Sequence, residues 1–365
     1  MLSLRQLLVA VAMAGLAWAG CAPCSAEPGV LCVVAGTGAT GFNGDGHKAL
    51  QTDFYQVSAA RRGPDGLLYV MDFNNHRLRR MTADGTVETV VGDGNHDFAI
   101  DGAAPTETPL ENPVEFAFSP SGTLHLIMLH DPRVLQVKDG VVRVIAGSDA
   151  VGDTGDGGPA RLAQFTQLTG IAFGADGSIY LADELANRVR KIGPDGVVVP
   201  FAGTGEPGFG GDGGPAVDAK LTEPRGLALG PEGSVYIADA GNHVIRRVRP
   251  DGIIETVAGR GGEHGFSGDG GPATSALLDR PRGVAVAADG VIFVADTNND
   301  RVRRVDAEGI ITTIAGTGVH GEDHANGDAL EAELSAPSSV ALDANGAKLL
   351  IAELGNSRVA EVGLR

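Results

Sequence analysis

Short apolar runs of strand length alternate with turn residues along the chain after residue 30. In one stretch the runs are residues 283–286, 291–296, 301–305 and 310–315, and Gly-containing turns such as 288–290 separate them. Most are rich in β-branched residues, and the third alternates apolar with basic residues, as a strand with one solvated face does. The pattern predicts four β-strands in this stretch.

The four-run pattern recurs at a fixed interval. A glycine follows the fourth run at positions 92, 147, 203, 259 and 316, at steps of 55, 56, 56 and 57 residues, and Gly36 lies 56 residues before the first. A fixed period indicates one supersecondary unit that is repeated. Four short strands in each unit are typical of a propeller blade. Because the second and third runs occur six times, we predict an all-β, six-bladed β-propeller of four-stranded blades.

The two ends of the repeat array complement each other. The last copy ends after its third run, at residues 358–362, and an unassigned apolar run covers residues 30–35. We therefore expect the N-terminal strand to complete the last blade, which removes the open sheet edge that promotes aggregation. The alternative, an open solenoid, leaves one run unexplained at each end.

The first twenty residues have the character of an export signal. Arg5 precedes an apolar run at 7–19, and small residues follow. Residues 18–21 (Trp-Ala-Gly-Cys) resemble a bacterial lipobox, so we expect residues 1–20 to be removed and Cys21 to be lipidated. Simple cleavage after Ala26 is the alternative.

This leader sets the expected organisation and location of the mature protein. A short tether at 21–29 precedes a single propeller domain at 30–365. A lipid chain on Cys21 would hold the propeller on a membrane of the bacterial cell envelope, either periplasmic or at the surface. With simple cleavage, the protein would instead be secreted.

All three cysteines lie near the N-terminus, at Cys21, Cys24 and Cys32. If Cys21 carries lipid, Cys24 and Cys32 either pair in an oxidising compartment or remain free thiols. Cys32 aligns with Glu255 and Thr312, which alternate outward, so we expect it to be reachable from solvent.

The chain is strongly acidic, with a formal net charge of −18 that is spread through the loops. Nucleic acid is excluded as an expected partner because phosphate binding needs a basic footprint. The charge fits solubility outside the cytoplasm. We expect a monomer whose only membrane contact is the lipid anchor.

One motif, Ala-Asp-x-x-Asn-x-Arg, joins the second and third runs. Its complete or partial copies are Asp72, Asn75 and Arg77; Asp183 and Arg188; Asp239 and Asn242; Asp296, Asn299 and Arg301; and Glu353, Asn356 and Arg358. With residues 224–248, which carry Pro-x-Gly-x-Ala and Val-Tyr-Ile-Ala-Asp, the motif resembles the NHL repeat family.

The resemblance covers essentially everything after the leader, and it extends to the propeller of teneurin-like surface proteins. It implies a six-bladed propeller. We expect the motif Asp and Arg to form a hydrogen-bonded pair that ties turn to strand in each blade. A repeated ligand site is the alternative.

A second motif, Gly-Phe-x-Gly-Asp-Gly-Gly-Pro-Ala, occupies residues 208–216 and 265–273. Its aspartate recurs at Asp45, Asp101, Asp156, Asp212 and Asp269. We expect these aspartates to cap short helices, with the proline in the first turn. Calcium binding at Asp45, Asp156, Asp212 and Asp269 is the alternative, although the alternating ligand ladder of known calcium loops is missing.

The start of each first strand should line the central channel, and the otherwise regular repeat varies there. The residues before the strand are Gln56, Asn112, Gln167, Glu223, Arg280 and Ala336, and those within its start are Ser58, Val114, Thr169, Arg225, Arg282 and Ser338. Variation on a repeated scaffold is typical of a binding surface, and also of unconstrained surface. Our candidate binding residues are Gln56, Asn112, Gln167, Glu223, Arg225, Arg280 and Arg282.

The second repeat departs from the motif, with Leu129 and Pro132 in place of Asp and Asn. It also carries His125, His130 and Asp131. Because strand alternation separates the two histidines, we interpret this repeat as degenerate rather than as a metal site.

No nucleophile–base pair, histidine cluster or cofactor motif stands out in the sequence. We therefore predict a non-enzymatic scaffold without a cofactor that binds protein or glycan. The alternative is a metal-dependent lactonase- or lyase-like enzyme, with a channel metal held by carboxylate and amide side chains. Its ligands would come from Glu223, Asn112, Gln167 and Gln56, but the adjacent Arg280 and Arg282 disfavour a bound cation.

Overall fold

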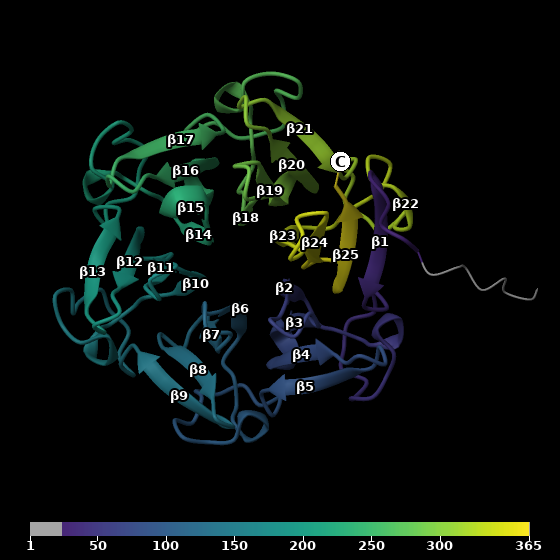
Figure 1. Ribbon diagram of the computed structural model, residues 1–365, viewed down its shortest axis with the longest axis horizontal. Helices are drawn as coiled ribbons and strands as arrows, with labels where there is room; N and C mark the ends of the chain where they lie inside the picture. Colours follow the sequence, from purple (N-terminus) through teal and green to yellow (C-terminus); the bar gives the residue numbers. More distant parts are fainter. Residues whose placement is uncertain (1–23, 365) are drawn as a thin grey trace, which may run out of the picture.

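The computed structural model describes residues 24–364, which form β-sheets arranged in a ring. There are six sheets, and each is a blade whose strands lie one after another from the centre of the ring to its perimeter (Figure 1). The described residues contain no α-helix. The prediction of an all-β, six-bladed propeller is confirmed.

The first strand of each blade lies next to the channel, and the second strand pairs with its outer side. The innermost strands are β2 (Val57–Arg62), β6 (Pro113–Phe118), β10 (Leu168–Phe173), β14 (Pro224–Leu229), β18 (Gly283–Val286) and β23 (Pro337–Leu342). The second strands are β3 (Leu68–Asp72), β7 (Leu124–Met128), β11 (Ile179–Asp183), β15 (Val235–Asp239), β19 (Ile292–Asp296) and β24 (Lys348–Glu353).

The two outer strands continue each antiparallel sheet. The third strands are β4 (Arg77–Met81), β8 (Val134–Lys138), β12 (Arg188–Ile192), β16 (Val244–Val248), β20 (Arg301–Val305) and β25 (Arg358–Gly363). The fourth strands are β5 (Val87–Val91), β9 (Val141–Ala146), β13 (Val198–Ala202), β17 (Ile254–Ala258), β21 (Ile311–Ala315) and β1 (Val30–Ala35).

Short 3-10 helices punctuate the connections. Those after fourth strands are η1 (Ala49–Gln51), η3 (Pro105–Glu107), η4 (Ala160–Leu162), η5 (Ala216–Asp218) and η8 (Ala273–Ser275). Those between strands of one blade are η2 (Phe73–Asn75), η6 (Pro231–Gly233), η7 (Ala240–Asn242) and η9 (Thr297–Asn299). Within residues 24–364, no helix has the length and hydropathy that a membrane span requires.

The glycine that marks the sequence period has a structural reason. Gly259 follows β17 with φ of +90°, in the left-handed region that favours glycine. A Cβ added to it would collide with the backbone carbonyl oxygen of His243, just before β16. The close approach of two chain segments therefore requires glycine once in every blade.

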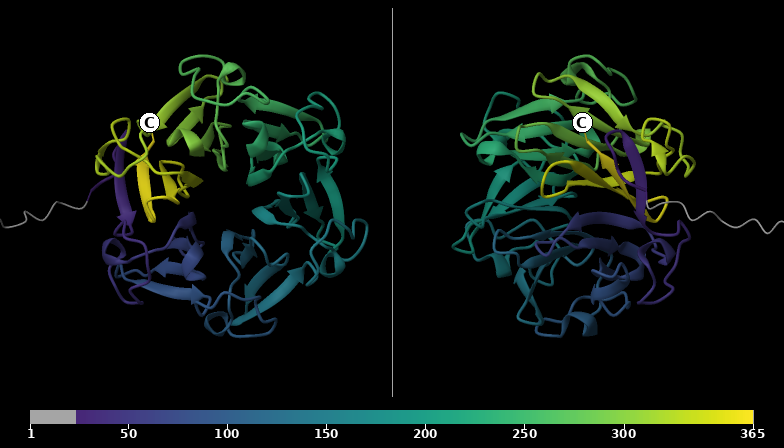
Figure 2. Two further views of the ribbon diagram at one scale, coloured as in Figure 1. Left: turned by 180° about the vertical axis from the view of Figure 1, so that it is seen from behind. Right: turned by 45° about the vertical axis from the view of Figure 1, so that its right-hand side comes forward.

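The N-terminal strand closes the ring, as expected. β1 pairs antiparallel with β25, with Leu31 opposite Val362, and the N-terminal and C-terminal strands lie side by side when the ring is seen from behind (Figure 2). A two-residue strand, β22 (Gly327–Asp328), then pairs with the outer side of β1. The last sheet therefore has five strands instead of the predicted four, because this brief pairing has no apolar run to reveal it.

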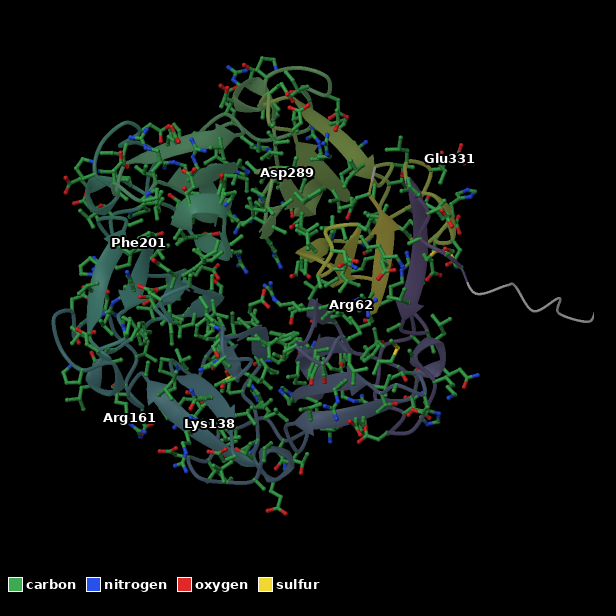
Figure 3. The ribbon with its side chains drawn as sticks, viewed as in Figure 1. Arg62, Lys138, Arg161, Phe201, Asp289 and Glu331 are labelled. Atoms are coloured by element: carbon green, nitrogen blue, oxygen red, sulfur yellow. A yellow bond between two sulfur atoms is a disulfide. The ribbon has the colours of Figure 1, made fainter. Side chains whose placement is uncertain are left out.

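Charged side chains lie along the perimeter of the ring. Lys138, Arg161 and Glu331 are exposed on the outer parts of their blades, whereas Arg62 lies near the centre, at the end of β2 (Figure 3).

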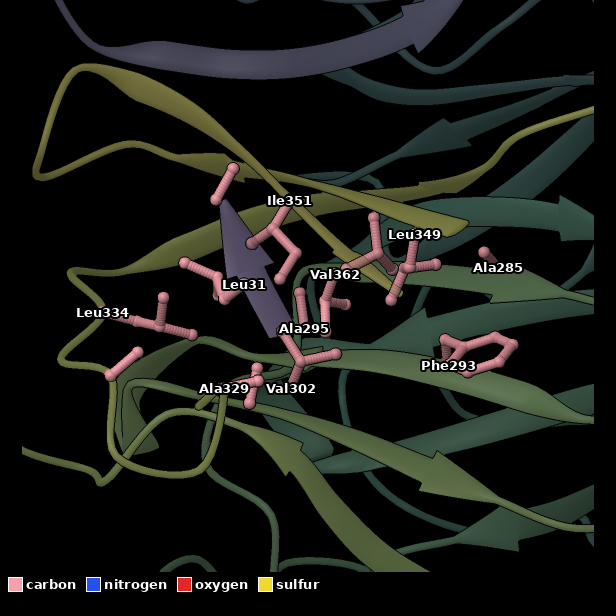
Figure 4. Packing of buried hydrophobic residues seen from close by; sticks show 14 of the residues in the cluster. Leu31, Ala285, Phe293, Ala295, Val302, Ala329, Leu334, Leu349, Ile351 and Val362 are labelled. Atoms are coloured by element: carbon pink, nitrogen blue, oxygen red, sulfur yellow. The ribbon is translucent and has the colours of Figure 1, made fainter. Parts of the chain in front are cut away.

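The hydrophobic core lies between adjacent blades. One cluster joins the fifth blade, through Phe293 and Val302, to the last blade, through Leu349 and Val362, and Leu31 of β1 packs into it (Figure 4). Corresponding clusters occupy the other interfaces between neighbouring blades. Because each blade buries its faces only against its neighbours, closing the ring completes the last of these interfaces.

Cys24 and Cys32 form a disulfide with a Cα–Cα distance of 5.7 Å. Cys32 is only 1% exposed. The prediction that Cys32 is reachable is therefore wrong, because the segment before β1 brings Cys24 against it. Cys21 and the predicted leader at 1–20 lie outside the described residues.

Candidate functional site

The repeated motif forms a buried polar network in the fourth blade. Asp239 is fully buried and accepts hydrogen bonds from the Thr222 backbone N–H and the Asn242 side chain, both at 2.8 Å. Arg246 lies 3.4 Å from Asp239 and also binds Asp212 at 2.6 Å. One guanidinium therefore bridges the motif aspartate and the aspartate of the Gly-rich loop.

The first and fifth blades repeat this network with an unexpected arginine. Arg79 contacts Asp72 at 3.3 Å, and Arg303 contacts Asp296 at 3.2 Å. The predicted pairing of these aspartates with the motif arginines is wrong there, because the carboxylate turns back toward the preceding loop and meets the guanidinium two residues further along β4 or β20. Arg77 instead donates to the backbone carbonyls of Asn75 and Asp93, at 2.8 and 2.7 Å. Arg301 donates to the backbone carbonyls of Asn299 and Thr317.

Two blades use other pairings. Glu353 binds Arg358 at 2.7 Å, as predicted, and also accepts a bond from Asn356. In the third blade Asp183 accepts bonds from Thr166 and Gln167, and Arg188 lies 3.3 Å from Asp153 instead. The predicted Asp183–Arg188 pair is therefore wrong.

The Gly-rich loop aspartates do not cap helices. The residues preceding η1, η5 and η8 are Lys48, Pro215 and Pro272, and none makes a side-chain cap bond. The aspartates instead bind arginines, in the pairs Asp45–Arg79, Asp101–Arg161, Asp156–Arg190, Asp212–Arg246 and Asp269–Arg303. The predicted cap is wrong because Asp45, Asp212 and Asp269 lie three residues before the N-cap position of the short helix that follows.

The same arginines weaken the calcium alternative. A hard cation needs several oxygen ligands with uncompensated negative charge, and these carboxylates already face guanidinium groups. Among residues 24–364, no three His, Cys, Asp or Glu side chains gather into a potential metal site.

The second blade is not simply degenerate: it keeps a buried ion pair, formed by residues at other positions of the repeat. The register pairs Pro113 with Met128, so Met128 and not Leu129 occupies the position of the motif aspartate. Asp131 and Arg133 form a buried ion pair at 2.6 Å. The carboxylate has therefore moved from the end of the second strand to the position that asparagine holds elsewhere.

The histidines of this blade do not converge, as expected. His125 is buried and contacts Gln136 and the Thr123 backbone carbonyl. His130 instead contacts Glu111 at 3.0 Å, and His96 contacts the same carboxylate oxygen at 2.6 Å. The sequence did not reveal this grouping because its members are up to 34 residues apart (96 to 130).

Five of the six residues before the first strands have a strained backbone. Those in the left-handed region are Gln56 (φ 63°), Asn112 (44°), Glu223 (49°), Arg280 (46°) and Ala336 (45°). Non-glycine residues rarely adopt this conformation, and it concentrates where a structure fixes functional groups. Gln167 holds the equivalent place in the third blade without a positive φ. The sharp turn sets the side chains around one mouth of the channel.

A cavity of about 270 Å³ opens at this mouth. Of the candidate residues, the cavity wall includes Gln56, Gln167, Arg225 and Arg282. The second set of aligned positions is complete in the wall, as Ser58, Val114, Thr169, Arg225, Arg282 and Ser338. Asn112, Glu223 and Arg280 lie outside the wall: Asn112 contacts His96 at 2.8 Å, and Glu223 pairs with Arg280.

The cavity contains a paired and an unpaired arginine. Arg225 binds Glu184 at 2.5 Å, and Gln167 donates to the same carboxylate at 3.4 Å. Burial raises the pKa of Glu184, an effect that Arg225 opposes. The Arg282 guanidinium has no hydrogen bond or ion pair with any described residue. Burial and then the charge of Arg225 lower the pKa of Arg282 to about 10.

Sequence reasoning missed Glu184 and Glu115 at this site. Glu115 lines the cavity and binds Arg61 at 3.1 Å. Glu184 directly follows the motif aspartate, at a position where Phe73 and Leu354 line the cavity in other blades. The residue at that position differs between blades, as the residues at the channel positions do, and this variation could have identified it as part of the site.

The opposite end of the channel is lined mainly by apolar residues. Its cavity of about 340 Å³ is lined by the ends of the innermost strands, including Phe118, Phe173, Leu229 and Leu342. The charged residues that line this cavity are Arg61 and Arg62, and Arg62 binds Glu361 at 2.8 Å.

Sequence comparisons agree with the fold. Residues 204–266 and 261–325 match the sequence model of the Teneurin NHL domain. The chain is 28% identical over 283 residues to Protein SUPPRESSOR OF QUENCHING 1, chloroplastic, of Arabidopsis thaliana, covering 72% of this chain and 26% of that protein. It is 28% identical over 337 residues to Teneurin-4 of Mus musculus, covering 81% of this chain and 12% of that protein. The chain thus spans about a quarter or less of each of these two relatives.

Solved structures share the fold at low sequence identity. An auxiliary nutrient binding protein from Bacteroides thetaiotaomicron has a TM-score of 0.67 and 16% identity, covering 92% of this chain and 76% of that one. A gluconolactonase from Xanthomonas campestris has a TM-score of 0.57 and 15% identity, covering 86% and 87%. The virginiamycin B lyase from Staphylococcus aureus has a TM-score of 0.51 and 13% identity, covering 85% and 80%.

The described residues therefore form a six-bladed β-propeller built from NHL-like repeats. In sequence, the chain is similar to teneurin NHL domains.

Proposed function

We propose that this chain is an exported, lipid-anchored propeller of the bacterial cell envelope that binds a protein or glycan without catalysing a reaction. The observation that supports binding is the channel mouth, where a cavity of about 270 Å³ holds an arginine without a protein partner. The nutrient-binding neighbour has the same fold, although at 16% identity. Membrane attachment through Cys21 is part of the proposal.

The charge at the mouth disfavours the lactonase- or lyase-like alternative. Glu223, the single carboxylate among its candidate ligands, is paired with Arg280. A divalent cation would have to displace that arginine and would then lie close to Arg282. Metal catalysis of this kind needs carboxylate or amide ligands free to coordinate, so a binding role agrees better with the contacts.

The test combines binding with turnover. The purified mature protein is passed over immobilised envelope glycans and envelope proteins, and each retained ligand is recovered and analysed. We expect saturable binding and an unchanged ligand. In parallel, lactone and ester substrates are offered with Mg²⁺, Ca²⁺ or Mn²⁺. Turnover that disappears in Glu223→Ala and persists in Arg304→Gln would establish the enzyme and overturn the proposal.

The anchor is tested separately. Labelled fatty acid fed to cells should be incorporated into the wild-type protein and not into Cys21→Ser. Equal labelling of both proteins, or labelling of neither, would contradict the lipid anchor and would leave the binding test unaffected.

A further inference from the structure

The channel carries more arginine than carboxylate. Its three carboxylates each have an arginine partner, in the pairs Arg61–Glu115, Arg225–Glu184 and Arg280–Glu223. Arg282 remains without a carboxylate among the described residues. In a chain of net charge −18, an arginine left alone inside a cavity indicates a missing negative partner, because a desolvated charge is costly unless it is paired.

The surroundings of Arg282 are arranged for an anion. Burial and the neighbouring Arg225 lower the pKa of Arg282 to about 10, so its environment disfavours the cation. The Nε atoms of both Arg225 and Arg282 are buried and lack a hydrogen-bond acceptor, as do those of Arg79, Arg246 and Arg303, but Arg282 alone of these has no carboxylate partner among the described residues. Guanidinium groups present several N–H donors in a planar fork that matches the two oxygens of a carboxylate. Together the two side chains can hold one carboxylate in the cavity.

The rest of the wall fits a ligand rich in hydroxyl groups. Ser58, Thr169 and Ser338 donate to backbone carbonyls at 3.5, 3.1 and 2.9 Å. Their oxygens therefore keep lone pairs that accept from a ligand. The Gln56 side-chain oxygen accepts a hydrogen bond from Asn74 at 2.7 Å, so the amide nitrogen of Gln56 remains available to donate to a ligand.

The size and the apolar part of the wall limit the ligand further. Phe73, Leu129 and Leu354 contribute carbon surface beside the polar groups. A volume of about 270 Å³ lies just below the range of about 300–1,000 Å³ typical of small-molecule pockets. There is room for one ring with its substituents, and a sugar ring presents both C–H and hydroxyl groups to such a wall.

We propose that the channel mouth binds a hexuronate residue, a sugar whose carboxylate is held by Arg282 and Arg225 and whose hydroxyls bond to Ser58, Thr169 and Ser338. This inference rests on the proposed binding function and narrows its ligand to acidic glycans. The carboxylate supplies the negative charge that the channel lacks, and Glu184 keeps Arg225 in position.

The test measures binding of glucuronate, glucose and inorganic phosphate to the purified mature protein by calorimetry. We expect glucuronate to bind at least 10-fold more tightly than glucose. Arg282→Gln should weaken glucuronate binding about 10- to 100-fold, as expected for the loss of charge-assisted hydrogen bonds. Arg282→Lys should retain part of the affinity, because it keeps the charge and loses the fork.

Arg304→Gln is the matched control. Arg304 also makes no ion pair with a described residue, and it lines a separate groove of about 400 Å³ between the fifth and last blades. Its substitution should leave glucuronate binding unchanged. Thermal denaturation of each variant establishes that it is folded before binding is compared.

Three outcomes would overturn the inference. Equal affinity for glucose and glucuronate would remove the role of the carboxylate, and phosphate binding tighter than glucuronate would replace the sugar acid with a simple anion. Equal loss in Arg282→Gln and Arg304→Gln would show non-specific attraction. In each case envelope proteins or neutral glycans retained in the capture experiment would leave the proposed function standing, whereas no retained ligand would contradict both.

Discussion

Arginine occupies two contrasting environments in this propeller. Arg246, in the outer half of its blade, is fully buried and contacts Asp239, Asp212 and two backbone carbonyls. Arg282, at the channel mouth, is half-buried and has no such partner among the described residues. The difference indicates that the repeated arginines stabilise the blade to which each belongs, whereas the channel arginine is available to a ligand.

The largest expected effect separates these two environments by stability. Arg246→Ala should lower the free energy of unfolding by about 3–5 kcal/mol, because it leaves the Asp239 carboxylate buried without its counter-charge. Arg282→Ala should not lower it, since no protein partner is lost and a desolvated charge without a counter-charge is removed. Urea denaturation at pH 7 measures both. Similar losses in the two variants would mean that Arg282 has a structural role after all.

The pH dependence of the buried network gives a smaller effect. Burial raises the pKa of Asp239 to about 6, from 3.8 for the free residue. Because the folded state then binds a proton more readily than the unfolded state, this group favours folding at low pH. That contribution is lost as the pH rises from about 4 to 6, by at most about 1.4 kcal/mol per pH unit.

A variant without the charge isolates this effect. Asp239→Asn cannot ionise, so its stability relative to the wild type should rise between pH 4 and pH 6. Denaturation of both proteins across that range measures the difference, in which other titrating groups cancel. A difference that is constant with pH would contradict the raised pKa.

The sequence predicted the structural features that every copy of the repeat shares. The period at Gly92, Gly259 and Gly316 reflects a close approach that each blade makes, so it identified the architecture and the closing strand. It also placed Arg225 and Arg282 on one channel wall, because aligned positions of a closed ring lie at the same height.

What the sequence did not predict depends on contacts between distant segments. The partner of Asp72 is Arg79 and not the motif arginine, and Arg79 also reaches Asp45, 34 residues away. Similarly, Arg225 pairs with Glu184 of the preceding repeat, at a separation of 41 residues. The Arg225–Glu184 pair occurs once, so no repeated spacing reveals it. The spacing of seven residues does recur, at Asp239–Arg246 and Asp296–Arg303, but spacing alone does not show which arginine of the third strand a carboxylate meets.

The smallest expected effect concerns the aromatic ring that covers the outer arginines. The Phe266 ring lies 3.7 Å from the Arg301 guanidinium carbon and 4.8 Å from that of Arg303, whereas the equivalent Phe209 has only Arg246, at 5.2 Å. Exposed cation–π contacts contribute about 0.5–1 kcal/mol each. Phe266→Leu should therefore destabilise the fold by about 1 kcal/mol and Phe209→Leu by about half as much. Urea denaturation of both variants measures this, and equal losses would mean that the second arginine adds nothing. A larger loss at Phe266 would sharpen the contrast with Arg282, on which no aromatic ring of residues 24–364 stacks.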